Sequence, residues 1–175
     1  MTKHLAVGDC NVAVYDEGSG PTILFVHGFP LSHAMWRGQL ENLKSRFRVV
    51  APDLRGFGES PLPTGDGAEA KSTMRQMADD CAAVLDALQI AAPVVLCGLS
   101  MGGYVAWQFA KHHSGKLRGL ILCDTKAAGD TPEAAETRRK MAEHVLKHGT
   151  SAVAEAMPGK LFAQITHHEK PEIVA

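Results

Sequence analysis

The sequence lacks the features that mark several large classes of protein. No apolar run reaches the roughly 18 residues that a membrane span needs, and the first residues lack the long apolar core of a secretory signal. Lys and Arg (18) nearly balance Asp and Glu (19), giving a net charge of -1, and the basic residues are scattered rather than gathered in a stripe. We therefore expect neither a membrane nor a nucleic acid as a partner, and a cytoplasmic location is the default expectation.

Cysteine motifs are also missing. The four cysteines form no CxxC or CxxH pair, so the sequence predicts neither a zinc framework nor a redox motif. Two of them end apolar runs, where a small thiol packs well in a core. We expect all four to be reduced core residues, namely Cys10, Cys81, Cys97 and Cys123. With 175 residues, 45% of them hydrophobic, the chain has the size and composition of an ordinary globular domain.

What is present is an alternation of strand and helix patterns. Two alternating apolar runs flank Gly8-Asp9, which is typical of a β-hairpin. Continuous apolar runs, typical of strands in a parallel sheet, occupy residues 21–28, 47–53, 92–98 and 117–124, and helical spacing occupies 32–46, 73–88 and 101–112. The alternation predicts an α/β fold with a doubly wound, mostly parallel sheet of about six strands, two antiparallel at the start and four parallel.

The strand pattern stops after residue 124. Residues 131–149 and 150–164 instead show two helical patterns, whereas a polar loop rich in Gly and Pro occupies 59–72. We therefore divide the chain into a sheet-containing core, residues 1–124, and a helical segment, residues 125–175. The sheet edge formed by the last strand is expected to be uncovered, which favours pairing with another copy of the chain.

The stretch VVLCGLSMGG places a serine between glycines, directly after a strand pattern and directly before a helix pattern. Such a serine is often only a turn residue. Here, however, Gly98, Ser100 and Gly102 form the pattern G-x-S-x-G in the strand–turn–helix context that a catalytic nucleophile requires. The sharp turn exposes the serine Oγ above the carboxyl edge of the sheet, beside the unpaired N–H groups of the helix. We therefore interpret Ser100 as a nucleophile.

The sequence FVHGFP ends the first continuous apolar run and suits a second role at the same edge. An oxyanion hole needs two convergent N–H donors, and we assign them to Phe29 and to Met101, the residue after the serine. Gly28 permits the turn between strand and loop. For His27 a hydrogen bond that braces the loop is preferred to metal ligation, because no other ligand lies at a suitable spacing.

Together these motifs resemble the α/β-hydrolase superfamily, and specifically its branch of esterases, enol-lactonases and non-haem haloperoxidases. The resemblance covers almost the whole chain and includes APDLRGFGES, similar to the D-x-R-G-x-G-x-S loop of the family, in which Asp53 and Arg55 are usually structural. It implies an incomplete α/β-hydrolase sheet followed by the start of a helical lid. Haloalkane dehalogenases need a carboxylate nucleophile at the sharp turn between strand and helix. Because this turn carries Ser100 rather than Asp, the resemblance does not extend to them.

The resemblance implies hydrolysis of small carboxylic esters or lactones through an acyl-enzyme on Ser100, with no metal or organic cofactor. His27 and Gly28 are expected at the substrate pocket, Trp36 is expected in the core with a place on the wall of the substrate pocket as the alternative, and a surface role is expected for His33. In the family the acid and the histidine of the triad follow later strands, which this sequence does not show. Asp124, at the end of the last strand, is the candidate for the acid.

Four explanations for the absent triad partners stay open. The chain is a fragment of a longer hydrolase, which we favour, or a naturally short homo-oligomer whose partner subunit supplies the residues. Alternatively Asp124 acts with a histidine of the helical segment, the candidates being His144, His148, His167 and His168. The last explanation is a binding module that retained the pocket without catalysis. Haloperoxidase or perhydrolase chemistry at the same serine is the nearest alternative reaction.

Overall fold

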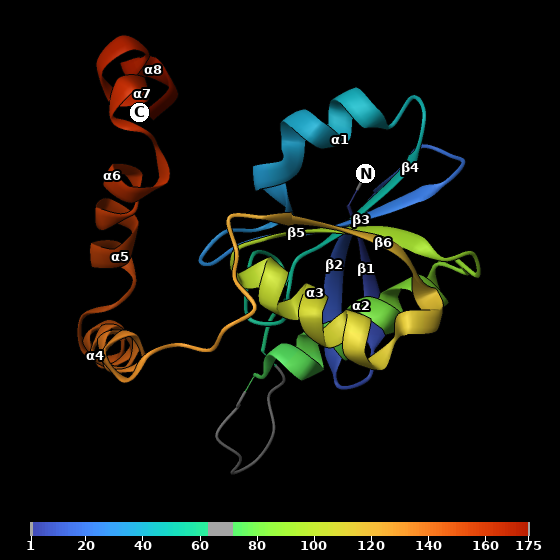
Figure 1. Ribbon diagram of the computed structural model, residues 1–175, viewed down its shortest axis with the longest axis horizontal. Coiled ribbons are helices and arrows are strands. Elements are labelled where there is room, and N and C mark those ends of the chain that lie inside the picture. Colours follow the sequence, from blue (N-terminus) through green and yellow to red (C-terminus); the bar gives the residue numbers. More distant parts are fainter. Residues whose placement is uncertain (1, 63–71, 175) are drawn as a thin grey trace. The chain divides into compact units, whose positions relative to one another are not determined.

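A computed structural model describes residues 2–62 and 72–174, so most of the polar loop expected over 59–72 lies outside the described residues. The strands are β1 (Thr2–Val7), β2 (Cys10–Glu17), β3 (Thr22–Val26), β4 (Arg48–Pro52), β5 (Val94–Leu99) and β6 (Leu117–Cys123). The helices that accompany them are η1 (His33–Trp36), α1 (Arg37–Leu43), α2 (Met74–Ala87), α3 (Met101–His112) and η2 (Ser114–Lys116) (Figure 1).

The strands form one sheet in the order β1-β2-β4-β3-β5-β6. The hairpin of β1 and β2 is antiparallel, and β2 also pairs antiparallel with β4. The remaining neighbours, β4 with β3, β3 with β5 and β5 with β6, are all parallel. The prediction of two antiparallel strands followed by four parallel ones is confirmed. Because β3, β4, β5 and β6 run the same way, their carboxyl ends share one edge of the sheet.

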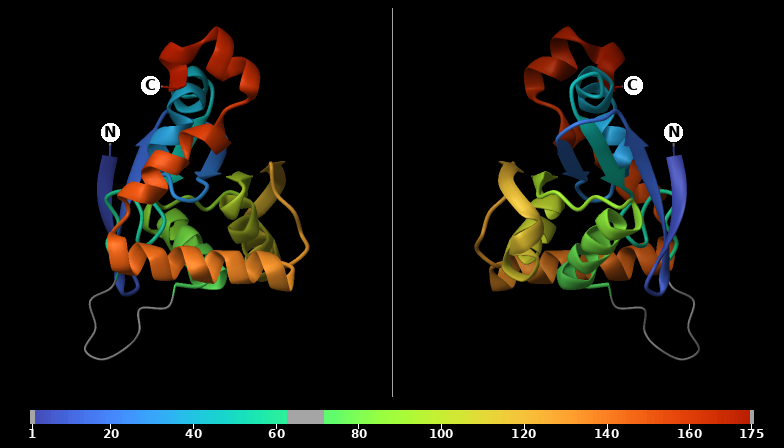
Figure 2. Two further views of the ribbon diagram at one scale, coloured as in Figure 1. Left: turned by 90° about the vertical axis from the view of Figure 1, so that its left-hand side faces the viewer. Right: turned by 90° about the vertical axis from the view of Figure 1, so that its right-hand side faces the viewer.

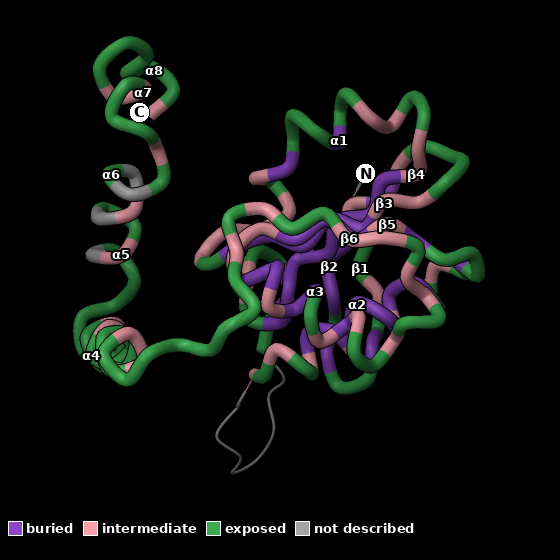
Figure 3. The backbone as a smooth tube through the Cα atoms, viewed as in Figure 1, coloured by how far each residue is buried: buried purple, intermediate pink, exposed green. Residues whose placement is uncertain are grey.

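Helices cover both faces of the sheet. Helices α2 and α3 lie on one face and α1 lies on the other (Figure 1). The larger buried cluster includes Met77 and Leu85 of α2 together with Phe109 of α3, whereas Trp36 and Leu40 belong to a smaller cluster on the face of α1. Because helices cover both faces, three of the five residues of β3 and four of the five residues of β4 are buried, and the others are half-buried (Figure 3).

Local sequence signals account for the helix starts. Thr73 caps α2 by accepting from the N–H of Gln76, whose side chain in turn accepts from the N–H of Thr73. Earlier in the chain, Ser32 caps the 3₁₀-helix η1 with a single bond, accepting from the N–H of Ala34. The single helix expected over 32–46 is wrong in detail, because the first turn is a 3₁₀-helix, η1, and the α-helical part is α1.

Strand β6, at the edge of the sheet, is less buried than the other parallel strands. None of its residues is buried, and Ile121 and Leu122 are exposed by 48% and 37% (Figure 3). All four cysteines are free, as expected; Cys10, Cys81 and Cys97 are buried and Cys123 is half-buried.

Two compact units make up the chain, residues 1–127 and 128–175; the division expected from the sequence lay at 124/125. The second unit contains α4 (Pro132–His148), α5 (Ser151–Ala156), α6 (Pro158–Leu161), α7 (Gln164–Glu169) and α8 (Pro171–Val174). The first of these is one continuous helix (Figure 2), whereas the second expected helix, over 150–164, is divided into α5 and α6. Within the described ranges, no helix combines the length and apolarity that a membrane span needs.

Candidate active site

Ser100 lies at the sharp turn between β5 and α3. Its backbone angles, φ 75° and ψ -102°, fall in a region that side chains with a Cβ rarely adopt. The neighbouring strand holds this conformation, because the N–H of Ser100 donates to the carbonyl of Cys123 at 3.0 Å and the hydroxyl of Thr125 donates to the carbonyl of Ser100 at 2.9 Å. The hydroxyl of Ser100 makes no capping bond with α3. The serine therefore occupies a strained position with its side chain uncommitted to the helix.

Glycines make this turn possible because the chain segments approach too closely for a Cβ. A Cβ on Gly98 would lie 2.7 Å from the carbonyl carbon of Gly102, and one on Gly102 would overlap the carbonyl oxygen of Val26. A Cβ on Gly103 would overlap Thr125. Real Cβ atoms do not make such contacts, so α3 is held directly against the ends of β3 and β6.

The loop after β3 lies against the serine. A Cβ on Gly28 would be 2.9 Å from Leu99 Cδ2 and 3.5 Å from the Cβ of Ser100. Phe29, the next residue, is 40% exposed, and its ring meets Phe57 edge-on at 6.0 Å between centroids. The structure thus brings the loop that carries Phe29 next to Ser100, although the direction of the Phe29 N–H relative to a substrate stays a prediction.

His27 braces this loop from below. Its Nε2 accepts the N–H of Leu54 at 3.0 Å, so the proton resides on Nδ1, which faces the carbonyl of Gly28 at 3.0 Å. The ring is fully buried, and this burial lowers the pKa of His27 below its ordinary value. The neutral ring has hydrogen-bond partners at both nitrogens and no exposed surface that a substrate could contact. These contacts fit a role in bracing the loop and do not fit the expected place on the wall of the substrate pocket.

A second histidine closes the far end of the same loop. Asp53, at the end of β4, accepts the backbone N–H of His33 at 2.7 Å and lies 2.8 Å from its Nδ1. Burial by itself raises the pKa of Asp53, but its bonds with His33 and Glu59 outweigh burial and lower it. The bond to Asp53 in turn raises the pKa of His33. The expected surface role of His33 is wrong, because its side chain is only 16% exposed and paired with a buried carboxylate.

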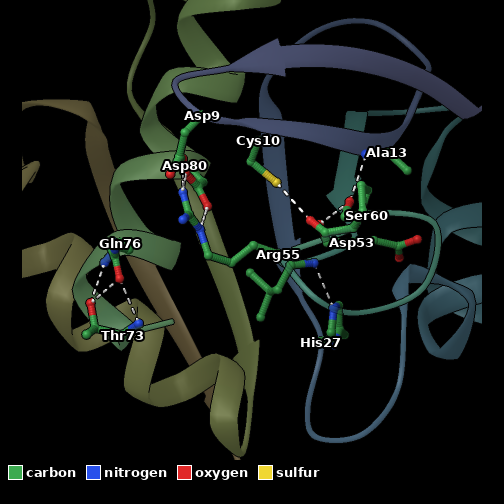
Figure 4. Close-up of polar contacts among 12 residues, drawn as sticks. Asp9, Cys10, Ala13, His27, Asp53, Arg55, Ser60, Thr73, Gln76 and Asp80 are labelled. Atoms are coloured by element: carbon green, nitrogen blue, oxygen red, sulfur yellow. Dashed lines mark hydrogen bonds and ion pairs between the residues drawn. The ribbon is translucent and has the colours of Figure 1, made fainter. Parts of the chain in front are cut away.

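Arg55 ties the following loop to two other parts of the sheet domain (Figure 4). Its guanidinium forms two bonds with Asp80 of α2, at 2.6 and 2.7 Å, and one with Asp9 of the hairpin turn at 3.1 Å. Nearby, Ser60 accepts from the N–H of Ala13 and donates to the carbonyl of Asp53. Both loops at this edge are thus fixed by buried polar contacts, in agreement with the structural roles expected for Asp53 and Arg55.

The two remaining candidates are Trp36 and Asp124. Trp36 is buried in the core cluster beneath α1, where its ring centroid is 5.1 Å from that of Phe25, as expected for a core residue; the alternative place on a pocket wall stays a prediction. Asp124 follows β6, is exposed and has φ 42°. It lies next in the chain to Cys123, whose carbonyl holds Ser100. Its role as triad acid also stays a prediction.

One residue that contacts the serine turn was not predicted from the sequence. Thr125 packs against Gly103 and donates to the carbonyl of Ser100. The available signal was Gly103 itself, since a second glycine in the first turn of a helix indicates that another segment approaches closely. Nothing in the local pattern identifies which segment that is.

The match to a known family agrees with this geometry. Residues 21–155 match the family described as the alpha/beta hydrolase fold. The chain belongs to the alpha/beta hydrolase fold family. This match begins before β3, contains the serine turn and the loop after β3, and extends into the second unit, which confirms the resemblance seen in the motifs.

Individual alpha/beta hydrolases resemble the chain over different extents. It is similar to a thermophilic esterase from Thermogutta terrifontis, solved with malate bound, with a TM-score of 0.89 and 43% identity, covering 99% of this chain and 64% of that one. It is also similar to the enol-lactonase from Burkholderia xenovorans LB400, with a TM-score of 0.84 and 28% identity, covering 98% of this chain and 64% of that one. Epoxide hydrolase 2 of Siraitia grosvenorii is 36% identical over 118 residues, 67% of this chain and 36% of that protein. The chain thus spans less than two thirds of the length of these relatives.

Proposed function

We propose that the chain provides the nucleophile and oxyanion hole of a serine hydrolase acting on small carboxylic esters or lactones. The observation that carries this proposal is the backbone of Ser100, held at φ 75° between glycines that admit no side chain. Strain of this kind costs roughly 1–3 kcal/mol and persists at functional sites. If this position served only as a turn, glycine would adopt the same backbone angles without strain. The presence of a serine therefore indicates a role for its side chain.

In the proposed reaction the Ser100 Oγ attacks the acyl carbon while a histidine base takes its proton. The N–H groups of Phe29 and Met101 stabilise the oxyanion of the tetrahedral intermediate, where one such donor contributes about 10²–10³ in rate. Collapse of the intermediate breaks the bond to the leaving alkoxide, which receives the proton, and leaves the acyl group on Ser100. Water then releases the acid by the same steps.

An ester or lactone is favoured over an epoxide by the extent of the similarity. Among solved structures, the esterase and the enol-lactonase match 99% and 98% of this chain with TM-scores of 0.89 and 0.84, whereas two epoxide hydrolases match 71% and 86% of it with TM-scores of 0.62 and 0.67. The hydroxyl nucleophile at Ser100 also suits acyl transfer, because it forms an ester that water hydrolyses.

The proposed acid is Asp124, which directly follows the strand that holds Ser100. His27 is not proposed as the base, because both of its ring nitrogens are engaged in the loop. A histidine of the second unit, of a partner copy or of a longer chain supplies the base, and the following experiment tests the first two sources.

The test is intact mass measurement of the 175-residue chain before and after exposure to a fluorophosphonate, with the adduct located by peptide digestion. We expect one adduct, on Ser100, and its absence in Ser100→Ala. Ser114→Ala is the matched control, because Ser114 is an exposed serine of the short helix η2 and removing it should leave labelling unchanged.

Hydrolysis of a short ester such as p-nitrophenyl acetate provides the second readout. Turnover that Ser100→Ala abolishes supports the proposal with a base inside the chain or its partner copy. An unlabelled Ser100 together with no turnover contradicts it for this chain. Peracid formation from acetate and hydrogen peroxide in place of ester hydrolysis would indicate the perhydrolase alternative, and ligand binding unaffected by Ser100→Ala without turnover would indicate a binding module.

A further inference from the structure

Two histidines lie one turn apart on α4, in the unit that does not contain Ser100. His144 and His148 occupy positions i and i+4 of a 17-residue helix, so both side chains project from the same face. Both residues are exposed, and their ring centroids are 4.6 Å apart with the ring planes inclined at 39°. Both histidines are also among the candidate bases for Ser100, but their position relative to each other does not depend on that role.

The spacing of the rings matches that of two imidazoles on one metal ion. A nitrogen of imidazole binds a divalent transition metal at about 2.0–2.1 Å, which places each ring centroid roughly 3.2 Å from the ion. Two imidazoles whose nitrogens form a right angle at the ion, as in the tetragonal geometry of Cu²⁺ and Ni²⁺, have ring centroids about 4.5 Å apart. The observed centroid separation of 4.6 Å is close to this value.

The end of the helix adds an electrostatic contribution. His148 is the last residue of α4, and Gly149 caps it. The unpaired carbonyls of a final helical turn carry partial negative charge, which favours a cation there. Lys140, one turn before His144, lies 3.9 Å from Glu136, which offsets part of its opposing charge.

From this geometry we propose that His144 and His148 form a two-coordinate binding site for a divalent transition metal ion of the imidazole-preferring class, Cu²⁺, Ni²⁺ or Zn²⁺. Among the residues that the structure describes, no group of three or more His, Cys, Asp or Glu side chains forms a metal site. The remaining positions on the ion are therefore filled by water. The order of affinity follows the general series, in which Cu²⁺ exceeds both Ni²⁺ and Zn²⁺.

Calorimetric titration of the untagged 175-residue chain with nickel chloride tests the site. We expect one Ni²⁺ per chain, with the affinity reduced at least about tenfold in both His144→Gln and His148→Gln, because either change removes the intramolecular second ligand. The variants are expected to keep the circular dichroism of the parent, since both residues are exposed. Copper should bind the same site more tightly.

The matched controls are two single variants, His167→Gln and His168→Gln. These histidines are consecutive on α7, so their side chains point about 100° apart and cannot both reach one ion. Each control variant should bind Ni²⁺ like the parent. Absence of binding by the parent, or equal loss in the control variants, overturns the proposal, and equal affinity in His144→Gln shows that the ring contact is packing only. None of these outcomes depends on Ser100.

Discussion

Strands β5 and β6 are adjacent, parallel and similar in composition, yet their surroundings are opposite. Four of the six residues of β5 are buried, whereas none of the seven residues of β6 is. Leu96 and Leu120 are register partners, but only Leu96 is fully buried. The difference shows that burial is set by position in the sheet: among the strands that the structure describes, β5 has a neighbour on each side, whereas β6 has a neighbour on one side.

A pair of glycines gives the largest expected effect. Gly98→Ala in β5 places a Cβ against the backbone of Gly102, and we expect it to remove most of a free energy of unfolding that is typically about 5–15 kcal/mol. Gly119→Ala in β6 meets nothing within 4 Å and should stabilise by about 0.5 kcal/mol, because it restricts the unfolded chain. Urea denaturation measures both. Similar losses in the two variants would show that β6 is packed against something in solution.

Leucines test the same contrast at smaller magnitude. Leu96→Ala in β5 empties a fully buried site and should cost about 2–5 kcal/mol. Leu122→Ala in β6, where the side chain is 37% exposed, should cost less than about 1 kcal/mol. Thermal and urea unfolding give the two values. A cost for Leu122→Ala that rises with protein concentration would indicate that a second copy covers the β6 edge.

The residues after the two strands both have positive φ and can be compared directly. Ser100→Gly should raise the free energy of unfolding by about 1 kcal/mol, since relief of a strain of about 1–3 kcal/mol exceeds the entropic cost of glycine. Asp124→Gly should change it by about zero, because aspartate tolerates φ near 42°. Unfolding curves of both variants decide, and a destabilised Ser100→Gly would contradict the strain argument.

The strands and the serine turn were largely predictable from the sequence because their signals are local. The apolar runs gave the strands within a few residues, and a glycine-flanked serine before a helical pattern gave the turn and the bounds of α3. The pairing of His33 with Asp53 was missed because the two residues are 20 positions apart and neither has an unusual neighbourhood. Thr125 was missed for the same reason. The uncovered edge at β6 was expected only because no further strand pattern follows it.

The smallest expected effect on the free energy of unfolding comes from the protonation of His33 and His27, in the loop after β3 and at its start. The raised pKa of His33 contributes stability that is complete below about pH 6.5 and is lost as the pH rises through that raised pKa. The lowered pKa of His27 contributes stability that is complete above about pH 6.5 and declines as the pH falls. Together they place a maximum of stability near that pH.

Urea unfolding at pH 5.5, 6.5 and 8 tests this maximum. His33→Asn should flatten the decline between pH 6.5 and 8 and leave the acid side unchanged. His113→Asn is the control, since His113 pairs with Asp79 on α2 rather than with a group of the loops at the serine. An unchanged alkaline decline in His33→Asn would assign it to other groups.

The strand order has a consequence for synthesis on the ribosome. Strand β3 lies between β4 and β5, but its second neighbour, β5, begins at Val94, long after β3 ends at Val26. At about 5–20 residues per second, the nascent chain waits several seconds with one side of its central strand unpaired. The hairpin and β4 can pair early, whereas the serine turn forms only after β5 and α3 have left the exit tunnel. The nucleophile is therefore among the last parts of the sheet domain to acquire its conformation during translation.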